Sequence, residues 1–416
     1  MNRRDFLVST GVAAACATQT ELAPVKALAA DVKPVRIRTI ETFNIEIPAT
    51  ATEVDAGVMN RAAVTRVVTE SGIRGYSFGG AGDGGYRSGG RGSGSPSARA
   101  GNFTQIRDAL VGADLFAVEE HLKKGLLDWG GIEEAIWDAI GKVAGQPICR
   151  LLGGSKTSIP VYITAVWRGP MDQSQVPIKD QAAYARRLKE AGFTGFKMRI
   201  FRPNFMDDVE SCAGVIAACG PAPGFKTMVD RTAHIPGKVW DYATAEAAAQ
   251  ALQKVGVYWL EEPFARDDFE SAARLAREVD ILITGGEGFR GLDAFKEALV
   301  HGTYDILQPD LRNVGGLLTT RKVAAMCEAF HKPCIGHGSY GLSVAGRVQV
   351  HAAWGAPLEE FALATPPLLP QEQWAPASKI LKSKELFTFR NGEVQVPQGP
   401  GLGLDLDEEA IEHYKV

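Results

Sequence analysis

From residue 158 onward, short apolar runs alternate with longer amphipathic segments. The apolar runs have the length of buried strands and lie at 160–166, 195–200, 226–230, 256–262, 281–287, 304–310, 332–337 and 358–363. The segments between them, such as 181–192, 243–256 and 319–332, repeat apolar residues at helical spacing. Eight strands alternating with helices predict an α/β fold, a parallel (β/α)8 barrel. A doubly wound open sheet is the alternative, but no GxGxxG motif links a predicted strand to a helix.

A different pattern precedes the barrel. Apolar and polar residues alternate within 33–75, above all in 35–47 and 63–70, as in antiparallel strands. Further along, 131–154 carries an apolar stripe at helical spacing. Between these parts lies 79–97, which is too rich in glycine and serine to pack. A lid over a site and a solvated loop are equal alternatives for this stretch.

The first 30 residues have the features of an export signal. The sequence RRDFL at 3–7 matches the twin-arginine pattern RRxFL, and Ala-Leu-Ala at 27–29 fits a cleavage site. The apolar run between them is shorter than the roughly 17 residues that a membrane-spanning helix needs. We therefore expect a cleaved signal peptide, 1–30, and a soluble periplasmic enzyme. Lipoprotein attachment at Cys16 is the alternative.

Composition narrows the range of partners. The chain has 416 residues, of which 45% are hydrophobic and 23% charged, as in a soluble protein with a large core. A formal net charge of −4 gives no reason to expect nucleic acid or an acidic membrane surface as a partner. The six cysteines show no CxxC and no zinc-like spacing. We expect a small-molecule substrate and no stable membrane span in the mature form.

Ionisable residues end seven of the eight predicted barrel strands. They are Lys197 with Arg199, Asp230, Glu261, Glu287, Asp310, His337 and Glu359, and successive members are 22 to 33 residues apart, about one βα unit. Strand ends of a closed barrel form a ring at its C-terminal face, where barrel enzymes build active sites. A single acidic residue there is more often a helix cap, but a whole ring of charges is costly without a ligand.

Three members of the ring form a predicted metal site. Asp230, Glu261 and Glu287 offer oxygen ligands only, which favours one Mg²⁺ over zinc. Lys197 and Arg199 point to the same face of the preceding strand because they are two residues apart. A metal and two cations around one point suit a substrate carboxylate that becomes an enediolate.

The predicted base is a histidine. Of the seven histidines, only His337 ends a predicted barrel strand. Asp310 ends the strand before it and is placed to orient the imidazole and raise its basicity. A lone histidine in a glycine-rich turn is more often structural, but the neighbouring aspartate favours a catalytic pair.

These motifs together resemble the enolase superfamily, in its mandelate racemase subgroup. The resemblance covers the chain from about residue 33 and rests on the order of the helix at 131–154 and the motifs FKMR, MVD, WLEEP, GGE, QPDLRNVGG and GHG. It implies a modified (β/α)7β TIM-like barrel at 158–370, a capping domain at 31–157 and a C-terminal segment, 371–416, that returns to the cap. It also implies a homo-oligomer.

The resemblance assigns the predicted residues their roles. It implies that Asp230, Glu261 and Glu287 bind the metal, and that Asp310 and His337 are the catalytic pair. Glu359 matches the residue that hydrogen-bonds the substrate carboxylate opposite the metal. The loops at 48–60 and 79–97 fall where caps of this family determine specificity, and Trp167, which follows the first strand, is a candidate substrate contact.

One position departs from the family pattern. The second strand commonly carries KxK, whose second lysine is a base, but Arg199 stands there and arginine is a poor base. Racemisation needs acid–base groups on both faces of the α-carbon, whereas β-elimination can use His337 alone. We therefore expect a Mg²⁺-dependent acid-sugar dehydratase, a lyase, in which Lys197 stabilises charge and Arg199 binds substrate. A racemase or epimerase, a cycloisomerase and a non-catalytic sugar-acid binding protein are the alternatives.

Overall fold

The computed structural model describes residues 33–51, 53, 60–79, 96–165, 167, 175–233, 235, 237–338, 341–364, 366, 368–369, 372 and 375–416. Residues 35–416 form one compact unit. The expected signal peptide with Cys16, and most of the stretches 48–60 and 79–97, lie outside the described residues. Among the residues that are described, no helix has the length and apolar character needed to cross a bilayer.

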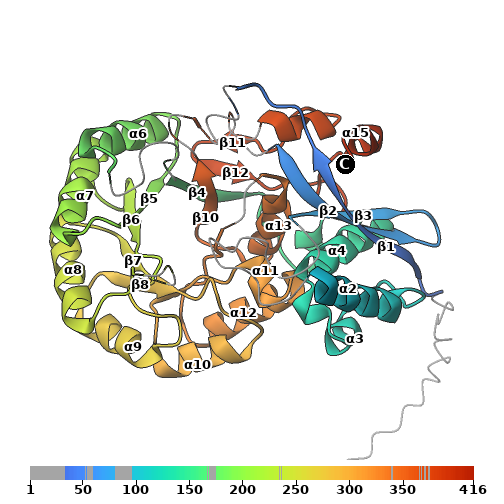
Figure 1. The fold of residues 1–416 in the computed structure, drawn as a ribbon, viewed down its shortest axis with the longest axis horizontal. Helices are drawn as coiled ribbons and strands as arrows, with labels where there is room; N and C mark the ends of the chain where they lie inside the picture. The colour runs from blue at the N-terminus through green and yellow to red at the C-terminus, as the bar shows by residue number, and fades with distance from the viewer. Residues whose placement is uncertain are drawn as a thin grey trace, which may run out of the picture. The chain divides into compact units, whose positions relative to one another are not determined.

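The N-terminal part forms a small antiparallel sheet covered by helices (Figure 1). Its strands are β1 (Ile37–Glu46), β2 (Arg61–Thr69) and β3 (Arg74–Phe78), as the alternating pattern predicted. The helices are α2 (Pro96–Leu110), α3 (Val118–Lys123), α4 (Gly130–Ala144) and α5 (Ile148–Leu151). The predicted single helix at 131–154 is thus two, because Gly145 ends α4 with a left-handed φ of 64°. A β-carbon at Gly75 would lie 2.0 Å from the Ala135 carbonyl oxygen, so β3 and α4 pack closely.

The second part is the predicted barrel of parallel strands with helices outside (Figure 1). Its strands are β4 (Ser158–Ala165), β5 (Gly195–Arg199), β6 (Lys226–Asp230), β7 (Trp259–Glu261), β8 (Leu282–Gly285), β9 (Ile306–Leu307) and β10 (Glu359–Ala364). Its helices are α6 (Ile178–Glu190), α7 (Phe205–Cys219), α8 (Tyr242–Val255), α9 (Phe269–Glu278), α10 (Asp293–His301), α11 (Leu311–Val314), α12 (Leu317–Ala329) and α13 (Val344–Trp354). The TIM-like α/β fold is therefore confirmed.

Two details of strand pairing place the site. The seventh predicted strand, 332–337, is present only as parallel bridges of Cys334 with Leu307 and of His337 with Asp310. This short strand still lies beside β9. The last strand, β10, pairs in parallel with the first strand, β4. The barrel order is therefore the predicted one, with a very short seventh strand.

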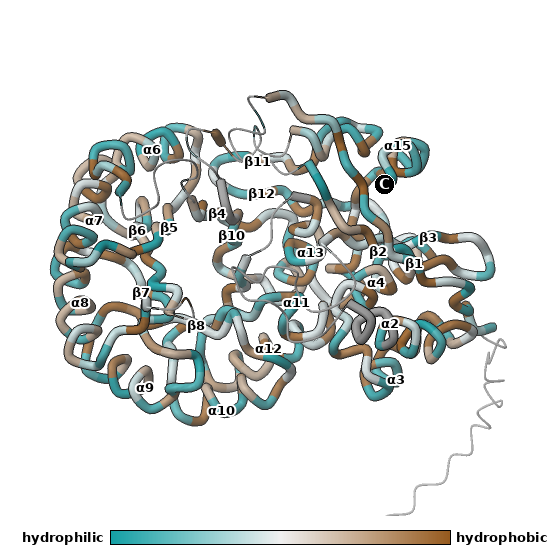
Figure 2. Tube along the Cα trace, in the orientation of Figure 1, coloured by the Kyte–Doolittle hydropathy of each residue, from teal (hydrophilic) through white to brown (hydrophobic). Residues whose placement is uncertain are grey.

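Side chains along the strands alternate between the barrel interior and the surrounding helices. Interior positions such as Tyr162, Trp259 and Leu358 form one buried cluster. The neighbouring positions, such as Leu260 and Phe361, belong to the larger cluster between strands and helices. Figure 2 shows hydrophobic and hydrophilic residues alternating along the helices that surround the strands, as expected when one helix face is buried. This alternation decides which strand residues can reach the barrel mouth.

The C-terminal segment contributes to both parts. Strand β12 (Glu393–Gln395) pairs with β4 and with β11 (Phe389–Arg390), so it extends the barrel sheet. Helix α15 (Glu408–His413) follows, and buried side chains of this segment join the core of the antiparallel sheet; they include Ile380, Leu381, Leu406 and Ile411. Contact of this segment with the cap is thus present, while the domain boundaries given above stay predictions.

Candidate active site

The inward-facing ends of β5, β6 and β7 form one row. The parallel register pairs Arg199 with Asp230, and Asp230 with Glu261, so these three side chains lie side by side at one height. Lys197 lies deeper on the same face of β5, because strand residues two apart point the same way. The structure therefore brings together four of the residues that the sequence placed at strand ends.

Lys197 is held between two carboxylates. Its Nζ atom lies 2.8 Å from Glu261 Oε2 and 3.0 Å from Glu360 Oε1, and all three side chains are buried. Burial alone would lower the pKa of Lys197, but the charges of Glu261 and Glu360 hold that pKa well above its usual range. The two carboxylates thus favour the protonated form of Lys197, which is suited to stabilise negative charge.

The carboxylates on β6, β7 and after β8 repel one another. Burial raises the pKa of Glu261 to about 8; Lys197 opposes this rise, and Asp230 and Glu287 add to it. Glu261 also accepts a hydrogen bond of 2.9 Å from Gln308 Nε2. A divalent cation would offset this repulsion, and three carboxylates are the hard oxygen ligands that Mg²⁺ prefers. The predicted ligand residues thus fit Mg²⁺.

Among the described residues, a cluster of possible metal-ligand atoms also includes the histidine. Single ligand atoms of Glu261, Glu287 and His337 lie within 4.8 Å of one another. Asp230 is not in that cluster; its Oδ1 atom accepts a 2.6 Å hydrogen bond from the Thr232 backbone. Its place beside Glu261 in the strand register nevertheless keeps it next to the cluster.

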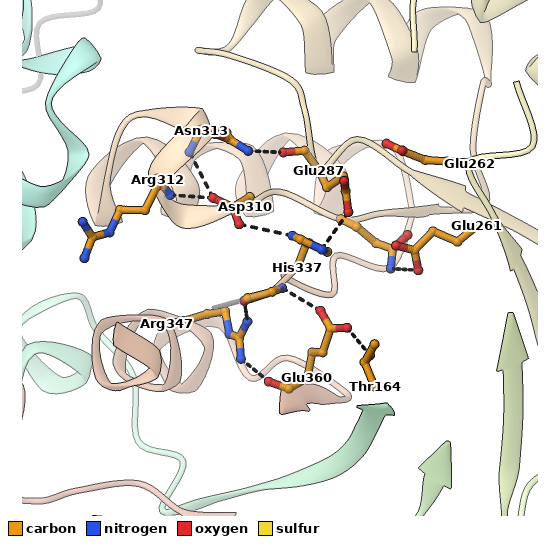
Figure 3. A network of polar contacts seen from close by, with 12 residues as sticks. Thr164, Glu261, Glu262, Glu287, Asp310, Arg312, Asn313, His337, Arg347 and Glu360 are labelled. Carbon is orange, nitrogen blue, oxygen red and sulfur yellow. Dashed lines mark hydrogen bonds and ion pairs between the residues drawn. The ribbon is translucent and has the colours of Figure 1, made fainter. Parts of the chain in front are cut away.

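His337 lies between two acidic residues (Figure 3). Its Nδ1 atom is 3.2 Å from Asp310 Oδ2, and its Nε2 atom is 2.7 Å from Glu287 Oε2. Burial would lower the pKa of His337, but Glu287 and Asp310 hold it well above its usual range. The predicted pair of Asp310 and His337 is therefore in contact through Nδ1. The other ring nitrogen, Nε2, faces Glu287.

Asp310 and Glu287 are fixed by their surroundings. The Oδ1 atom of Asp310 accepts the backbone N–H groups of Arg312 (2.9 Å) and Asn313 (3.1 Å), so Asp310 caps helix α11. The Asn313 side chain donates to the Glu287 carbonyl at 2.9 Å. The carboxylate of Asp310 thus has two separate roles, because Oδ1 caps helix α11 while Oδ2 orients His337.

Arg266 is a site residue that the sequence did not predict. Its Nε atom lies 2.9 Å from Glu262 Oε1, and its guanidinium also pairs with Glu287 Oε1. Glu262 is buried and has a positive φ of 43°, a conformation that is costly for a residue other than glycine. The pair of Glu262 and Arg266 therefore holds one oxygen of Glu287, while the other oxygen faces His337.

The predicted position of Glu359 is wrong. Its carboxylate lies 2.5 Å from Arg347 Nε and also pairs with His351, on the helix side of β10. The neighbouring residue, Glu360, faces the barrel interior, where it contacts Lys197 and accepts from the Gly338 N–H at 2.6 Å. Adjacent strand residues point to opposite faces, so only one glutamate of this pair can reach the mouth.

Trp167 is not directed toward the carboxylates. Its ring packs against Tyr184 at 5.7 Å and against Phe196 at 6.3 Å between ring centroids. Phe196 belongs to the cluster between strands and helices, so this contact is a packing contact. The geometry thus gives no support to the predicted role of Trp167 in substrate binding.

One of the residues missed by sequence reasoning carried a usable signal. Gln308 lies two residues before Asp310 and thus points to the same side of its strand, whereas the sequence gives no reason to prefer Glu360 over Glu359. Arg266 follows a strand within a loop, where no periodicity exists to predict its direction. Only the structure could assign it to the site.

Comparison with known proteins identifies the family. A family profile described as "Enolase C-terminal domain-like" matches residues 180–410. An arabinonate dehydratase of Saccharolobus solfataricus is 31% identical over 286 residues, which cover 68% of this chain and 71% of that protein.

Two solved structures are similar over most of their length. A racemase from Streptomyces coelicolor A3(2) with bound magnesium aligns with a TM-score of 0.69 and 25% identity, covering 91% of this chain and 100% of that chain. A mandelate racemase/muconate lactonizing enzyme from Polaromonas sp. JS666 aligns with a TM-score of 0.70 and 23% identity, covering 92% of this chain and 97% of that chain. This chain belongs to the enolase superfamily, in its mandelate racemase subgroup.

Proposed function

We propose that this protein is a Mg²⁺-dependent dehydratase of an acid sugar, an aldonate or aldarate. It removes the α-proton of the substrate and eliminates the β-hydroxyl group as water, which leaves a 2-keto-3-deoxy acid. The observation that carries the proposal is the set of contacts at the barrel mouth, in which Asp310 binds Nδ1 of His337. Lys197 is bound between the carboxylates of Glu261 and Glu360, and Arg199 carries a guanidinium group, so among the described residues at the barrel mouth His337, in contact with Asp310, is the group suited to exchange a proton.

The metal would be held by Asp230, Glu261 and Glu287. When bound, Mg²⁺ would polarise the substrate carboxylate and offset the charge of Glu287, which raises the pKa of His337. Asp310 holds Nδ1 of His337, so Nε2 is the atom that receives the α-proton. Lys197 stabilises the negative charge that develops on the substrate carboxylate.

The remaining side chains bind and complete the elimination. Glu360, rather than Glu359, faces the barrel mouth, where its carboxylate binds Lys197 and can accept a hydrogen bond from a hydroxyl group of the substrate. Arg199, whose Nε atom lies 4.0 Å from Asp230 Oδ2, can clamp a carboxylate or hydroxyl group as a forked donor. The imidazolium formed at His337 then donates its proton to the departing hydroxyl group, so that one residue acts first as base and then as acid.

The test is a screen of the purified protein with Mg²⁺ against aldonic and aldaric acids, detecting 2-keto acid products. Turnover that is lost with EDTA and in His337→Asn, while Mg²⁺ binding is kept in that variant, supports the proposal. Product formation by His337→Asn at the wild-type rate contradicts it.

Racemisation or epimerisation of a 2-hydroxy acid is the second candidate, supported by the similarity to a racemase. Exchange of the α-proton in deuterated water with inversion, and without loss of water, would identify it. Binding of sugar acids with neither exchange nor product would identify a non-catalytic binding protein.

We also propose export of this protein to the periplasm and self-association. Export is supported by the twin-arginine-type sequence at residues 3–7 and the cleavage site at 27–29. Mass spectrometry of protein from the periplasmic fraction should show an N-terminus near residue 30, and a lipid-modified Cys16 would contradict this. Light scattering of the purified protein should give a mass above one chain.

A further inference from the structure

Glu359 belongs to a buried ionic group on the outer side of the barrel wall. Its carboxylate is enclosed by two side chains of α13, Arg347 and His351, and all three side chains are fully buried. Taking such charges out of water costs several kcal/mol for each ion by general estimates, and apolar side chains often replace buried ion pairs without loss of stability. A contribution to stability alone therefore does not explain why three ionisable side chains are buried here.

Arg347 connects this group to the active-site side of the wall (Figure 3). Its guanidinium donates to the backbone carbonyls of Gly338 and Glu360, in addition to its 2.5 Å contact with Glu359. The N–H of Gly338 donates in turn to the Glu360 side chain at 2.6 Å. Gly338, which follows the proposed base, is thus held on one side by Arg347 and on the other by Glu360.

His351 fixes the residue before the base. A β-carbon at Gly336 would lie 2.0 Å from His351 Nε2, so the imidazole packs directly on the Gly336 backbone. Glu359 orients this imidazole through Nδ1. The residues on both sides of His337 are therefore held by side chains of α13.

We propose that Arg347, Glu359 and His351 form a positioning group for His337 and Glu360. The group sets the position of both active-site side chains through the Gly336–Gly338 backbone and the Glu360 carbonyl, and none of its members contacts the substrate. This inference rests on the proposed function, because it assumes that His337 and Glu360 act on a substrate. It also gives the two adjacent glutamates different roles: Glu360 acts in the active site, and Glu359 binds the side chains of Arg347 and His351 that position Glu360.

The decisive variant is Arg347→Lys. Lysine keeps the positive charge, but its single ammonium group cannot bind Glu359 and the carbonyls of Gly338 and Glu360 at the same time. Its matched control is Arg202→Lys, because Arg202 is another buried arginine that binds a carboxylate, Asp208 at 2.6 Å, and a carbonyl, that of Val176 at 2.6 Å. We expect kcat of Arg347→Lys to fall about 100-fold, as for a misplacement of roughly 1 Å. KM and Mg²⁺ affinity should stay within about threefold, and kcat of Arg202→Lys should stay near the wild-type value.

Crystal structures of both variants separate this inference from the proposed function. Displacement of the Gly338 peptide and the His337 ring in Arg347→Lys, but not in Arg202→Lys, supports the positioning role even if no substrate is known. An unchanged loop in Arg347→Lys, or a loss of kcat that follows the loss of thermal stability equally in both variants, overturns it. If Arg347→Lys does not fold, Glu359→Gln should still displace the loop, and an unmoved His337 in that variant overturns the inference.

Discussion

Asp310 allows the orientation of the base to be tested apart from the stability of the fold. In Asp310→Asn the amide oxygen can still accept the N–H groups of Arg312 and Asn313, which lie 2.9 and 3.1 Å from Oδ1, because asparagine caps helices as well as aspartate does. The substitution instead replaces Oδ2, which lies 3.2 Å from His337 Nδ1, with an NH₂ group. An NH₂ group there donates rather than accepts, so it stabilises the tautomer that carries its proton on Nε2.

That tautomer cannot accept the α-proton. We expect kcat to fall by roughly 10²- to 10⁴-fold, the range expected when general-base catalysis or the tautomer of a catalytic histidine is lost. This loss corresponds to about 3–5 kcal/mol of barrier height. The unfolding free energy should change by less than about 0.5 kcal/mol, because the helix cap is kept.

The assay combines steady-state 2-keto acid formation with thermal unfolding. Asp310→Ala is the matched control, because it removes both tasks of the carboxylate and should also lose about 1 kcal/mol of stability. A kcat of Asp310→Asn within threefold of the wild type would refute the role of Asp310 in orienting His337. A stability loss as large as that of the alanine variant would refute the division of tasks.

Three further results are expected. Glu360→Gln should lower kcat/KM for the sugar acid by about 10²-fold, because it removes the carboxylate charge that holds the Lys197 ammonium group at 3.0 Å; steady-state kinetics measures this. Arg266→Met should weaken Mg²⁺ binding about 10- to 100-fold by calorimetry, because a ligand carboxylate loses its support. Arg66 lowers the pKa of Glu41 and of Glu412, so its stabilising contribution is complete above the unfolded pKa near 4.5 and is lost as the pH falls through the lower folded values. The difference in melting temperature between wild type and Arg66→Met should therefore be larger at pH 7 than at pH 3.

Each of these expectations has a clear contrary result. For Mg²⁺ binding the control is Arg274→Met, which removes an exposed pair with Glu278, and equal affinities of the two variants would argue against the Arg266 support. A melting difference for Arg66→Met that is independent of pH would exclude the ionic contribution. Turnover of Glu360→Gln equal to that of the wild type would remove Glu360 from the reaction.

The sequence predicted the barrel because its signal is repeated. Eight apolar runs, seven of which end in an ionisable residue, recur at intervals of one βα unit, and the strand 332–337, which is shorter than predicted, does not disturb the order. The strand-end positions of Asp230, Glu261, Glu287, Asp310 and His337 followed from the same regularity. Their positions depend on the ends of strands and not on the exact length of each one.

The errors occurred where periodicity gives two equal answers or none. The run 358-LEEFAL-363 offers one glutamate to each face, and only the pairing of Glu360 with the inward-facing Tyr162 on β4 decides between them. Arg266 lies in a loop whose course depends on tertiary contacts. Trp167 follows a strand end, but its ring turns back onto Tyr184 and Phe196.

The attachment of the C-terminal segment to β1 has a consequence for biosynthesis. The Glu46 N–H donates to the Tyr414 carbonyl at 2.9 Å, and Ile45 bridges to Lys415, although the two pairs are 368 and 370 positions apart in the sequence. At a synthesis rate of roughly 5–20 residues per second, the outer edge of β1 waits on the order of 20–70 s for its partner. An unpaired strand edge invites pairing with other chains during that interval. The capping sheet can therefore be completed only after the barrel has been synthesised, and a chaperone that shields the β1 edge on nascent chains should increase the yield of folded protein.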